Sequence, residues 1–342
     1  MSYLVTVIVP VLNEENYIEE FLTSIEQQSY PFSKFEVFII DGCSTDNTIK
    51  KINAFIPQSQ LNISLFENPK QSQASAMNIG IRHSNAKYVI RLDAHANYQS
   101  NYIEAAVNLL EETGVDNVGF YIESSGKNQF AKRVARIQSS KFGVGNSNFR
   151  TENTSTVEAD TVPFGAFKRE TLIELEGFDE RFLCNEDNDI NNRIIKKGGK
   201  ILLSDRSGAT YYARDNLSSL VKMSLRNGKW NIISLYYNST AMRLRHFVPL
   251  LFTSSILFCL TLSFIHVLFR YMLLAEMLLY VTCAIYYSKS IAKSIPDFFQ
   301  TVFLFFIFHF TYGLGSIIGI FNYINLLLKE KNNIQRGLNL NG

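Results

Sequence analysis

Two residues with metal- and phosphate-binding chemistry, Asp93 and His95, follow the apolar run at positions 88–92. A carboxylate and an imidazole separated by one residue can both face one divalent cation, and hard cations of this kind commonly bridge phosphates. The carboxylate suits Mg²⁺ or Mn²⁺, whereas the imidazole suits Mn²⁺ better or can instead hydrogen-bond a phosphate directly. We therefore expect a diphosphate site here, with Mg²⁺ or Mn²⁺ as its candidate cofactor.

A second group of carboxylates lies at positions 185–189, at the start of a segment with Ile190 and Ile194 at helical spacing. The helix dipole favours acids in a first turn, so a surface role would be enough to account for them. A carboxylate aimed at a bound hydroxyl can also act as a general base. Glu186 and Asp187 are therefore candidate catalytic residues.

The elements that position these residues alternate between strand and helix, which predicts an α/β domain with a mainly parallel sheet. In such a sheet the binding residues gather at the carboxyl ends of the strands. Pro10, which we expect to end the first strand, Asp41 and Asp93 all lie at such ends, and Asn13 is the predicted cap of the first helix. The predicted strands are 4–9, 35–40, 63–66 and 88–92, and further helices start at 44–48 and span 74–82.

Composition divides the 342 residues into two parts. Residues 1–245 carry charges throughout, whereas residues 246–328 are dominated by Phe, Leu, Ile and Tyr. The net charge of +2 gives no sign of nucleic-acid binding. The four cysteines have no short metal-type spacing, and we expect reduced, structural thiols. The N-terminus lacks the features of a signal peptide, so we expect the catalytic half to stay in the cytoplasm.

Several segments together resemble family 2 glycosyltransferases, which have the GT-A fold. The resemblance covers roughly residues 4–230, in the order and spacing of the family. The Asp93–His95 variant and the hydrophobic C-terminus most resemble membrane-attached enzymes of bacterial exopolysaccharide assembly, of the succinoglycan glucosyltransferase type. The segments that carry the resemblance are 7–14, 40–46, 76–80, 92–95, 177–180, 186–193 and 198–201.

This resemblance implies roles for individual residues. Asp187 would be the catalytic base of an inverting hexosyltransferase (EC 2.4 type), with Glu186 and Asp189 as neighbours or alternates. One departure bears on the donor base: the common Asp-Asp-Gly is Asp41-Gly42-Cys43 here, so a contact of the second acid with uracil is lost or moved. The residues implied in binding the nucleotide sugar are Pro10, Asn13, Glu14, Asp41, Asn78 and Asp93.

On the acceptor side, the resemblance implicates Gly165, Arg226 and Trp230. Gly165 lies in a predicted strand and turn where glycine permits close backbone approach. The segment 226–230 partly matches the Gln-x-x-Arg-Trp segment of processive synthases, whose Trp lies under the acceptor sugar. An interfacial anchor is the alternative role of Trp230, because indoles favour the bilayer boundary.

The apolar part predicts a membrane region. We expect a transferase domain at 1–215, interfacial amphipathic helices at 216–245 that rest on anionic headgroups, a transmembrane region at 246–328 and a polar tail at 329–342. The predicted hydrophobic segments are 247–269, 271–287 and 298–320, with Arg270 in the turn between the first two.

Basic residues predict the orientation of these segments. Arg243 and Arg245 before the first segment, and Lys289 and Lys293 after the second, indicate the cytoplasm, as expected for a multi-pass protein of the inner membrane. Three full spans would place the basic tail outside, so either the third segment is re-entrant or the charge of the tail is too weak to matter.

The expected function is an inverting transfer of a sugar from a nucleotide diphosphate, by expectation a UDP-sugar, to a glycan on polyprenyl diphosphate in surface-polysaccharide assembly. One alternative is a processive synthase, against which the partial Trp motif and the few helices count. An alternative of another class is a non-catalytic membrane scaffold, which predicts eroded acids, yet Asp41, Asp93 and Asp187 are present. A nucleotidyltransferase would more often have a Gly-rich, basic loop after its first strand.

Overall fold

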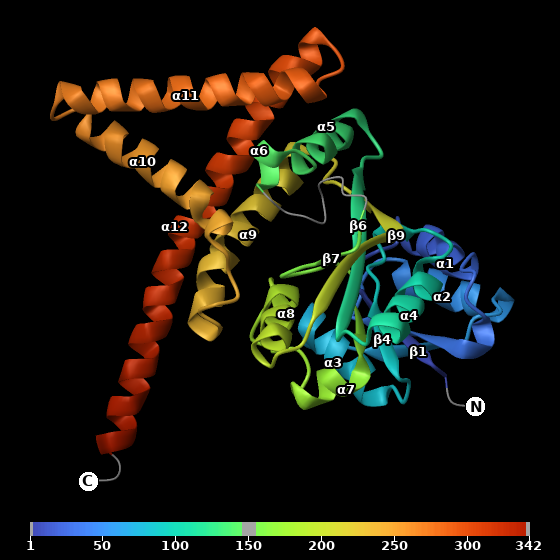
Figure 1. Cartoon of the computed structure of the whole chain (residues 1–342). Coiled ribbons are helices and arrows are strands. Elements are labelled where there is room, and N and C mark those ends of the chain that lie inside the picture. Colours follow the sequence, from blue (N-terminus) through green and yellow to red (C-terminus); the bar gives the residue numbers. More distant parts are fainter. Residues whose placement is uncertain (1–2, 146–154, 340–342) are drawn as a thin grey trace. The chain divides into compact units, whose positions relative to one another are not determined.

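The computed structural model of the chain describes residues 3–145 and 155–339 (Figure 1). The chain divides into two compact units, which we describe separately. The sheet unit comprises residues 1–125 and 147–212, and the helical unit comprises residues 126–146 and 213–342. Residues 126–146 fall inside the transferase domain expected at 1–215. This segment groups with the C-terminal helices because one face of it packs into their hydrophobic core.

The described residues of the sheet unit form one mixed sheet with the strand order β3-β2-β1-β4-β8-β6-β9-β5, in which β7 also pairs with β9. β3, β2, β1 and β4 are parallel, as predicted, whereas β8 lies antiparallel between β4 and β6. The strands are β1 Val5–Val11, β2 Phe35–Asp41, β3 Ile63–Glu67, β4 Tyr88–Arg91, β5 Ala96–Tyr98, β6 Asn117–Ser125, β7 Val157–Glu158, β8 Ala166–Lys168 and β9 Ile201–Tyr212.

Helices cover both faces of this sheet, and β1 shows why. Its successive side chains point to opposite faces, so Val7 and Val9 join the core of one face while Ile8 joins the core of the other, with Met77 and Ile190. All three β1 side chains are fully buried. The helices are α1 Ile18–Glu26, α2 Thr48–Phe55, α3 Gln73–His83, α4 Tyr102–Thr113, α7 Arg169–Glu174 and α8 Glu186–Lys196.

Two local predictions at the end of β1 were wrong. The strand does not end at Pro10 but continues to Val11. It tolerates the proline because pairing with β4 has ended at Ile8, so no ladder bond on that side needs the missing N–H. Asn13 does not cap the first helix, which begins at Ile18. Its side-chain oxygen instead accepts a hydrogen bond from the backbone N–H of Thr45 at 2.8 Å.

The described part of the helical unit contains three helices long and apolar enough to cross a membrane. The candidate spans are Leu244–Leu262, Val267–Ile291 and Ile295–Lys331. The region expected to hold interfacial helices contains one α-helix, α9, and a short 3₁₀ helix, η4. The elements are α5 Gln129–Gln138, α6 Lys141–Val144, α9 Leu217–Tyr237, η4 Leu244–Phe247, α10 Val248–Leu262, α11 Val267–Ile291 and α12 Ile295–Asn339.

The break between the first two apolar helices comes earlier than predicted. α10 ends at Leu262, and α11 begins after His266, whose ring nitrogen accepts from the backbone N–H of Leu268 at 3.1 Å. Arg270 is therefore not in the turn but in the first turn of α11, where it donates to the carbonyl of Ser263 at 2.8 Å. This bond satisfies a carbonyl at the C-terminus of α10.

Glycines allow the helices around α12 to pack backbone to backbone. A Cβ on Gly228 of α9 would lie 1.9 Å from the carbonyl oxygen of Tyr312, and one on Gly315 would lie 2.2 Å from that of Leu225. Ser316 adds a hydrogen bond from its hydroxyl to the Gly228 carbonyl at 3.1 Å. α9 therefore uses one face to pack on α12, as small residues do in membrane helix pairs.

In the sheet unit, the close contact between α3 and β1 gives a test of how tightly the helix packs on the sheet. A Cβ on Gly80 would lie 2.5 to 2.8 Å from three side-chain atoms of Ile8. We expect Gly80→Ala to lower the free energy of unfolding by about 1–3 kcal/mol through overpacking. Ile8→Ala removes all three atoms, so the double variant should be no less stable than Ile8→Ala alone, measured by chemical denaturation of the purified protein. Additive losses would contradict this account.

Candidate active site

The loops that follow β1 and β2 are tied together at the carboxyl edge of the sheet. Asn13 accepts from Thr45, and its backbone N–H donates to the hydroxyl of Ser44 at 2.9 Å. Asp41, at the end of β2, accepts from the backbone N–H of Ser44 at 3.1 and 3.2 Å. Asn13 and Cys43 have positive φ angles of 55° and 62°. Such backbone strain is commonly found at functional sites.

The structure brings two predicted residues, Glu14 and His95, into direct contact. His95 Nδ1 lies 3.0 Å from Glu14 Oε1, although the residues come from the ends of different strands. The imidazole also meets the rings of Tyr17 and Tyr211 edge-on, at centroid distances of 6.5 and 5.4 Å. A carboxylate partner and neighbouring aromatic rings therefore orient the imidazole of His95.

A buried arginine that the sequence analysis passed over connects the two acidic groups. Arg91, on β4, donates from Nε to Asp93 Oδ1 at 3.1 Å and from Nη1 to Glu186 Oε1 at 2.9 Å. The three residues are only 8%, 6% and 5% exposed, respectively. The candidate donor site and the start of α8 therefore share one cation. We call Arg91, Asp93 and Glu186 the buried triad.

The electrostatics of the buried triad differ between its two acids. Burial alone would raise the pKa of Asp93, but the charges of Arg91 and His95 outweigh it and hold that pKa below its ordinary value. Burial raises the pKa of Glu186; Arg91 lowers it in part, and the charge of Asp187 raises it again. Asp93 is therefore held ionised, whereas Glu186 takes up a proton more readily than a free glutamate.

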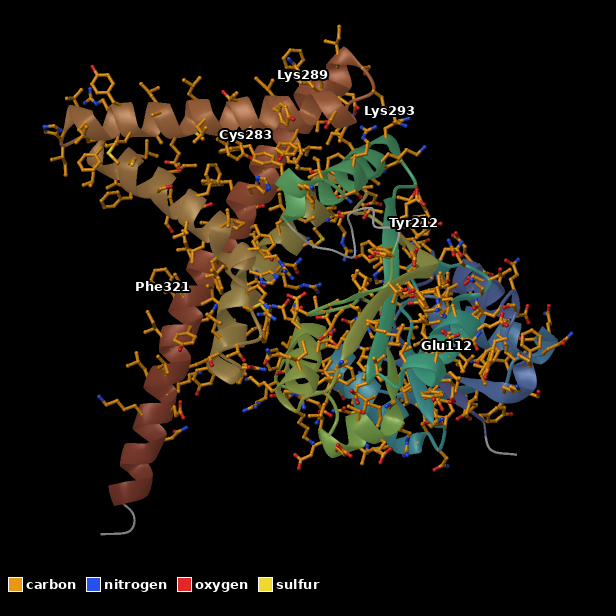
Figure 2. The ribbon with its side chains drawn as sticks, viewed as in Figure 1. Glu112, Tyr212, Cys283, Lys289, Lys293 and Phe321 are labelled. Carbon is orange, nitrogen blue, oxygen red and sulfur yellow. The ribbon has the colours of Figure 1, made fainter. Side chains whose placement is uncertain are left out.

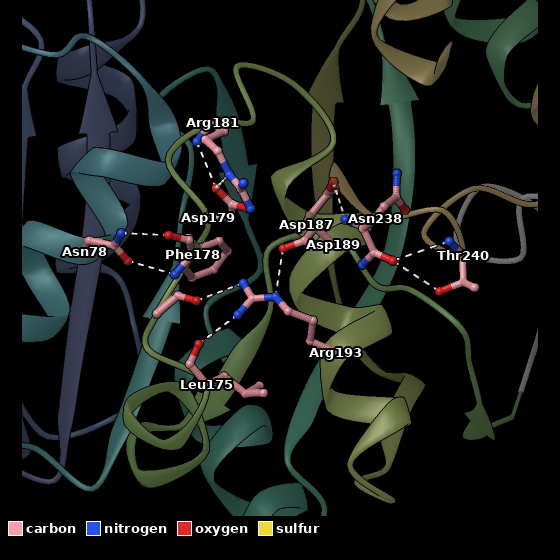
Figure 3. A network of polar contacts seen from close by, with 12 residues as sticks. Asn78, Leu175, Phe178, Asp179, Arg181, Asp187, Asp189, Arg193, Asn238 and Thr240 are labelled. Carbon is pink, nitrogen blue, oxygen red and sulfur yellow. Dashed lines mark hydrogen bonds and ion pairs between the residues drawn. The ribbon is translucent and has the colours of Figure 1, made fainter. Parts of the chain in front are cut away.

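Polar contacts to the preceding loop fix α8 (Figure 3). Arg193 donates to the carbonyls of Leu175 and Gly177 at 2.7 and 2.8 Å and to Asp189 at 2.8 Å. The helix starts after Asn185, which has a φ of 67°. This anchoring keeps the first turn of α8, with its carboxylates, in one position.

Asn78 lies in the same network, in a role other than nucleotide binding. Its amide pairs with both backbone groups of Phe178, donating to the carbonyl and accepting from the N–H at 2.8 Å each, and also donates to Glu180 at 3.1 Å. In this structure Asn78 therefore holds the loop before α8. A contact of Asn78 with the nucleotide sugar stays a prediction.

The two candidate bases have different surroundings. Glu186 is buried and bound to Arg91. Asp187 is partly exposed, and its Oδ1 accepts from the backbone N–H of the next residue, Asn188, at 2.8 Å. A general base needs a carboxylate oxygen that the substrate hydroxyl can reach. The geometry therefore favours Asp187 as the base and gives Glu186 a supporting position.

The three predicted acceptor residues lie in different parts of the chain. Gly165, next to β8, accepts from the backbone N–H of Arg91 at 3.0 Å. A Cβ on it would lie 2.6 Å from Asn117 Oδ1, so packing of the protein itself requires this glycine. Arg226 and Trp230 belong to α9 in the helical unit, where Arg226 is exposed and Trp230 is partly buried. Their role in acceptor binding stays a prediction.

The donor set fits a cation that is shared with a substrate. Among the described residues, no group of three or more His, Cys, Asp or Glu side chains could hold a metal. Asp93 and His95 offer one oxygen and one nitrogen donor. Mg²⁺ is commonly bound by one or two carboxylates together with substrate phosphates rather than by an all-protein cage. The site therefore suits a divalent ion whose other ligands come from a diphosphate.

Arg91 and Tyr98 are the site residues that sequence reasoning missed. Tyr98 accepts from the backbone N–H of Asp93 through its hydroxyl at 2.8 Å and so orients the turn after β4. Arg91 had a usable signal, because an arginine inside an otherwise apolar central strand must be buried and therefore needs acidic partners. Tyr98 had no such signal in the sequence, because only the folded backbone brings its hydroxyl to the N–H of Asp93.

Comparisons with known proteins bear on the family and the fold of the chain. Residues 6–174 match the family model described as glycosyl transferase family 2. The succinoglycan biosynthesis protein ExoA of Rhizobium meliloti is 30% identical over 246 residues, which cover 71% of this chain and 74% of that protein. A glycosyltransferase of Methanococcus voltae, named as a dolichyl N-acetyl-alpha-D-glucosaminyl phosphate 3-beta-D-2,3-diacetamido-2,3-dideoxy-beta-D-glucuronosyltransferase, is 27% identical over 68% of this chain and 77% of its own length.

Among solved structures, the mannosyltransferase PcManGT from Pyrobaculum calidifontis, in complex with GDP-Man and Mn²⁺, superposes with a TM-score of 0.57. It is 20% identical, and the match covers 95% of this chain and 88% of that one. At this identity the likeness shows the fold, which is GT-A.

The buried triad predicts a large effect of a single substitution. Arg91→Met leaves two buried carboxylates without their cation, and we expect it to lower the free energy of unfolding by about 3–5 kcal/mol. Arg206→Met is the matched control, because it removes an exposed pair with Glu112 and should cost less than about 1 kcal/mol. Chemical denaturation measures both, and equal effects would contradict the triad.

The opposite pKa shifts of the two acids predict opposite pH dependences in the presence of EDTA. The pKa of Asp93 is lower in the folded protein than its ordinary value of 3.8. The ionised carboxylate therefore stabilises the fold at pH values above 3.8, and this stabilisation is lost as the pH falls through the pKa of the folded state. The advantage of wild type over Asp93→Asn should therefore shrink below pH 3.8. The pKa of Glu186 is raised above its ordinary value of 4.5, so the stability that its protonated form contributes to the protein is lost as the pH rises above 4.5. Over that pH range the stability of Glu186→Gln should increase relative to that of wild type. Thermal unfolding across pH measures both slopes, and parallel slopes would refute the assignment.

Proposed function

Because this chain belongs to glycosyl transferase family 2, and is therefore a glycosyltransferase of polysaccharide or glycan biosynthesis, we propose that it is an inverting hexosyltransferase with a lipid-linked acceptor. Its donor would be a nucleoside diphosphate sugar, by expectation a UDP-sugar. The observation that carries the proposal is the buried triad, which places an ionised Asp93 and the acids of α8 around one arginine.

The donor would lie along the carboxyl edge of the sheet. Glu14 and Asp41, with the loops that Asn13 joins, form the nucleotide end. Pro10 shapes the same pocket from the end of β1. The diphosphate would meet Asp93 and His95, with which a bound divalent cation would offset its charge as it leaves. Arg91 holds Asp93 ionised whether or not a cation is bound.

The transfer step needs a base on the acceptor side. The hydroxyl oxygen of the acceptor attacks the anomeric carbon, the bond from that carbon to the diphosphate oxygen breaks, and the nucleoside diphosphate leaves with the electron pair. The proton of the hydroxyl goes to the Asp187 carboxylate. The in-line displacement inverts the anomeric centre. Glu186 stays bound to Arg91 and keeps the first turn of α8 in position.

Two observations support a lipid-linked acceptor. Residues 3–145 and 155–339, which the structure describes, include three helices long and apolar enough to cross a membrane. The Methanococcus voltae relative is named for a dolichyl-phosphate-linked sugar substrate. We place the enzyme in the cell membrane with its transferase domain in the cytoplasm, where nucleotide sugars are made, and assign Arg226 and Trp230 to the acceptor.

The test is sugar transfer by membranes that contain the protein, with radiolabelled nucleotide sugars and a lipid extract. Asp187→Asn should lower kcat by about 10²–10⁴-fold, because general-base catalysis typically contributes that much, with little change in the KM for the donor. EDTA should abolish transfer, and added Mn²⁺ or Mg²⁺ should restore it.

Asp179→Asn is the matched control, because this carboxylate lies before α8 and pairs with Arg181 at the surface. It should keep most of the activity. Wild-type rates in Asp187→Asn would refute the base. Long polymer as the product would favour the processive alternative, and no transfer with any donor would favour the scaffold.

A further inference from the structure

Residues 126–146 leave the sheet unit directly after β6 but pack with the helical unit. Val134 and Ile137 of α5 are fully buried in a core that they share with Leu304 and Phe305 of α12. A segment that connects two strands across the surface of a domain is often an irregular loop. Residues 126–146 instead contain two short helices, α5 and α6, whose buried face is apolar. Its place in the fold is therefore fixed by α12.

An ion-pair cluster holds α5 at the first turn of α12. Arg133 donates to Asp297 Oδ1 at 2.6 Å, and Arg136 donates to both Asp297 oxygens at 2.8 and 2.6 Å. The backbone N–H of Lys293 donates to the same carboxylate at 2.8 Å. Two guanidinium groups share one carboxylate, so the anchor keeps an excess of positive charge.

Phe142 of α6 adds an aromatic anchor. Its ring is stacked on Tyr287 of α11, with centroids 5.2 Å apart and planes 6° apart. It also meets Phe305 and His309 of α12, each at 5.0 Å. Aromatic side chains that gather at one end of apolar helices are typical of a membrane–water boundary.

The surface around these anchors is strongly basic. Residues 126–146 include five Lys or Arg and no Asp or Glu. Lys132 and Lys141 of this segment are exposed. Lys289 at the end of α11 and Lys293 in the link to α12 are also exposed (Figure 2). We call these four lysines the basic end of the helical unit.

Exposed apolar side chains accompany the basic end. Tyr286, Ile295 and Phe299 are 70%, 75% and 66% exposed. They belong to α11 and α12, which continue away from this end as helices that are apolar enough to span a bilayer. Lysines beside exposed aromatic and aliphatic side chains fit the headgroup level of a membrane, where each apolar body enters the acyl boundary and each ammonium meets a phosphate.

We propose that residues 126–146 are a membrane-surface element, whose Lys132 and Lys141, together with Lys289 and Lys293, bind the phosphates of anionic phospholipid headgroups. The occupant is lipid because charge complementarity and continuity with the apolar helices point to the same surface. Ser125 ends β6, and the element follows it directly in the chain. None of the four lysines belongs to the proposed sugar-transfer site.

The test follows the depth of the element in a bilayer. The full chain, with its four native cysteines replaced and Ser139→Cys labelled with a fluorophore, is reconstituted in nanodiscs of phosphatidylcholine with or without phosphatidylglycerol. Lipids that carry a spin label on the headgroup should quench the fluorophore more than aqueous iodide does, and more so with phosphatidylglycerol. Each lysine at an anionic surface strengthens membrane binding roughly fivefold. The double variant Lys132→Glu, Lys141→Glu should therefore lower the ratio of lipid-bound to water-exposed element at least about tenfold, which is measured as less quenching by the spin-labelled lipid and more by iodide. High salt should also lower the quenching by the spin-labelled lipid, because it screens the attraction between the lysines and the anionic headgroups.

Lys34→Glu with Lys50→Glu is the matched control, because it reverses two exposed lysines of the sheet unit and should leave the quenching unchanged. Thermal unfolding of both double variants confirms that they fold. Iodide quenching that is equal in both kinds of nanodisc, or equal in both double variants, would overturn the proposal. The readout does not involve sugar transfer, so its outcome is independent of the proposed function.

Discussion

The neutralisation of one buried guanidinium organises the sheet unit. Arg91 lies in the central strand β4, where it is only 8% exposed, and Asp93 and Glu186 are the carboxylates that compensate its charge. A buried charge without partners costs several kcal/mol, so the fold can place the strand and the first turn of α8 together only if these contacts form. The same requirement brings Asp93, at the end of β4, and Glu186, at the start of α8, to one guanidinium.

Around this centre, side chains hold the loops at the carboxyl edge more than regular pairing does. Asn13 joins the loops after β1 and β2, and Asn78 and Arg193 hold the segment before α8. Non-glycine residues with positive φ lie at these loops, among them Asn13 and Asn185. Such strained positions persist only where their surroundings determine them fully, which suits a site that must be in place before its substrate binds.

The helical unit follows a different rule, because its helices are apolar enough to cross a membrane. Backbone contacts through Gly228 and Gly315 bring α9 and α12 close together where bulky side chains would keep them apart. Its ionic contact with residues 126–146 lies at the start of α12, beside Asp297, rather than along the apolar helices. Ion pairs at the end of the helices and van der Waals contacts along their length are what helices at a membrane boundary require.

The sequence by itself determined the α/β order, the parallel strands β1 to β4, the apolar helices and the positions of Asp41, Asp93 and Glu186, because these follow from local periodicity and from chain order. Only the tertiary structure decided the partners of those residues. The pairing of Glu14 with His95, the use of Asn78 as a loop clamp and the salt bridge of Arg91 with Glu186 join residues far apart in the chain. The strand end beyond Pro10, the start of α11 and the membership of residues 126–146 also depend on neighbours in space. Local patterns predict which groups carry charge, but the low dielectric of the interior decides where those charges must meet.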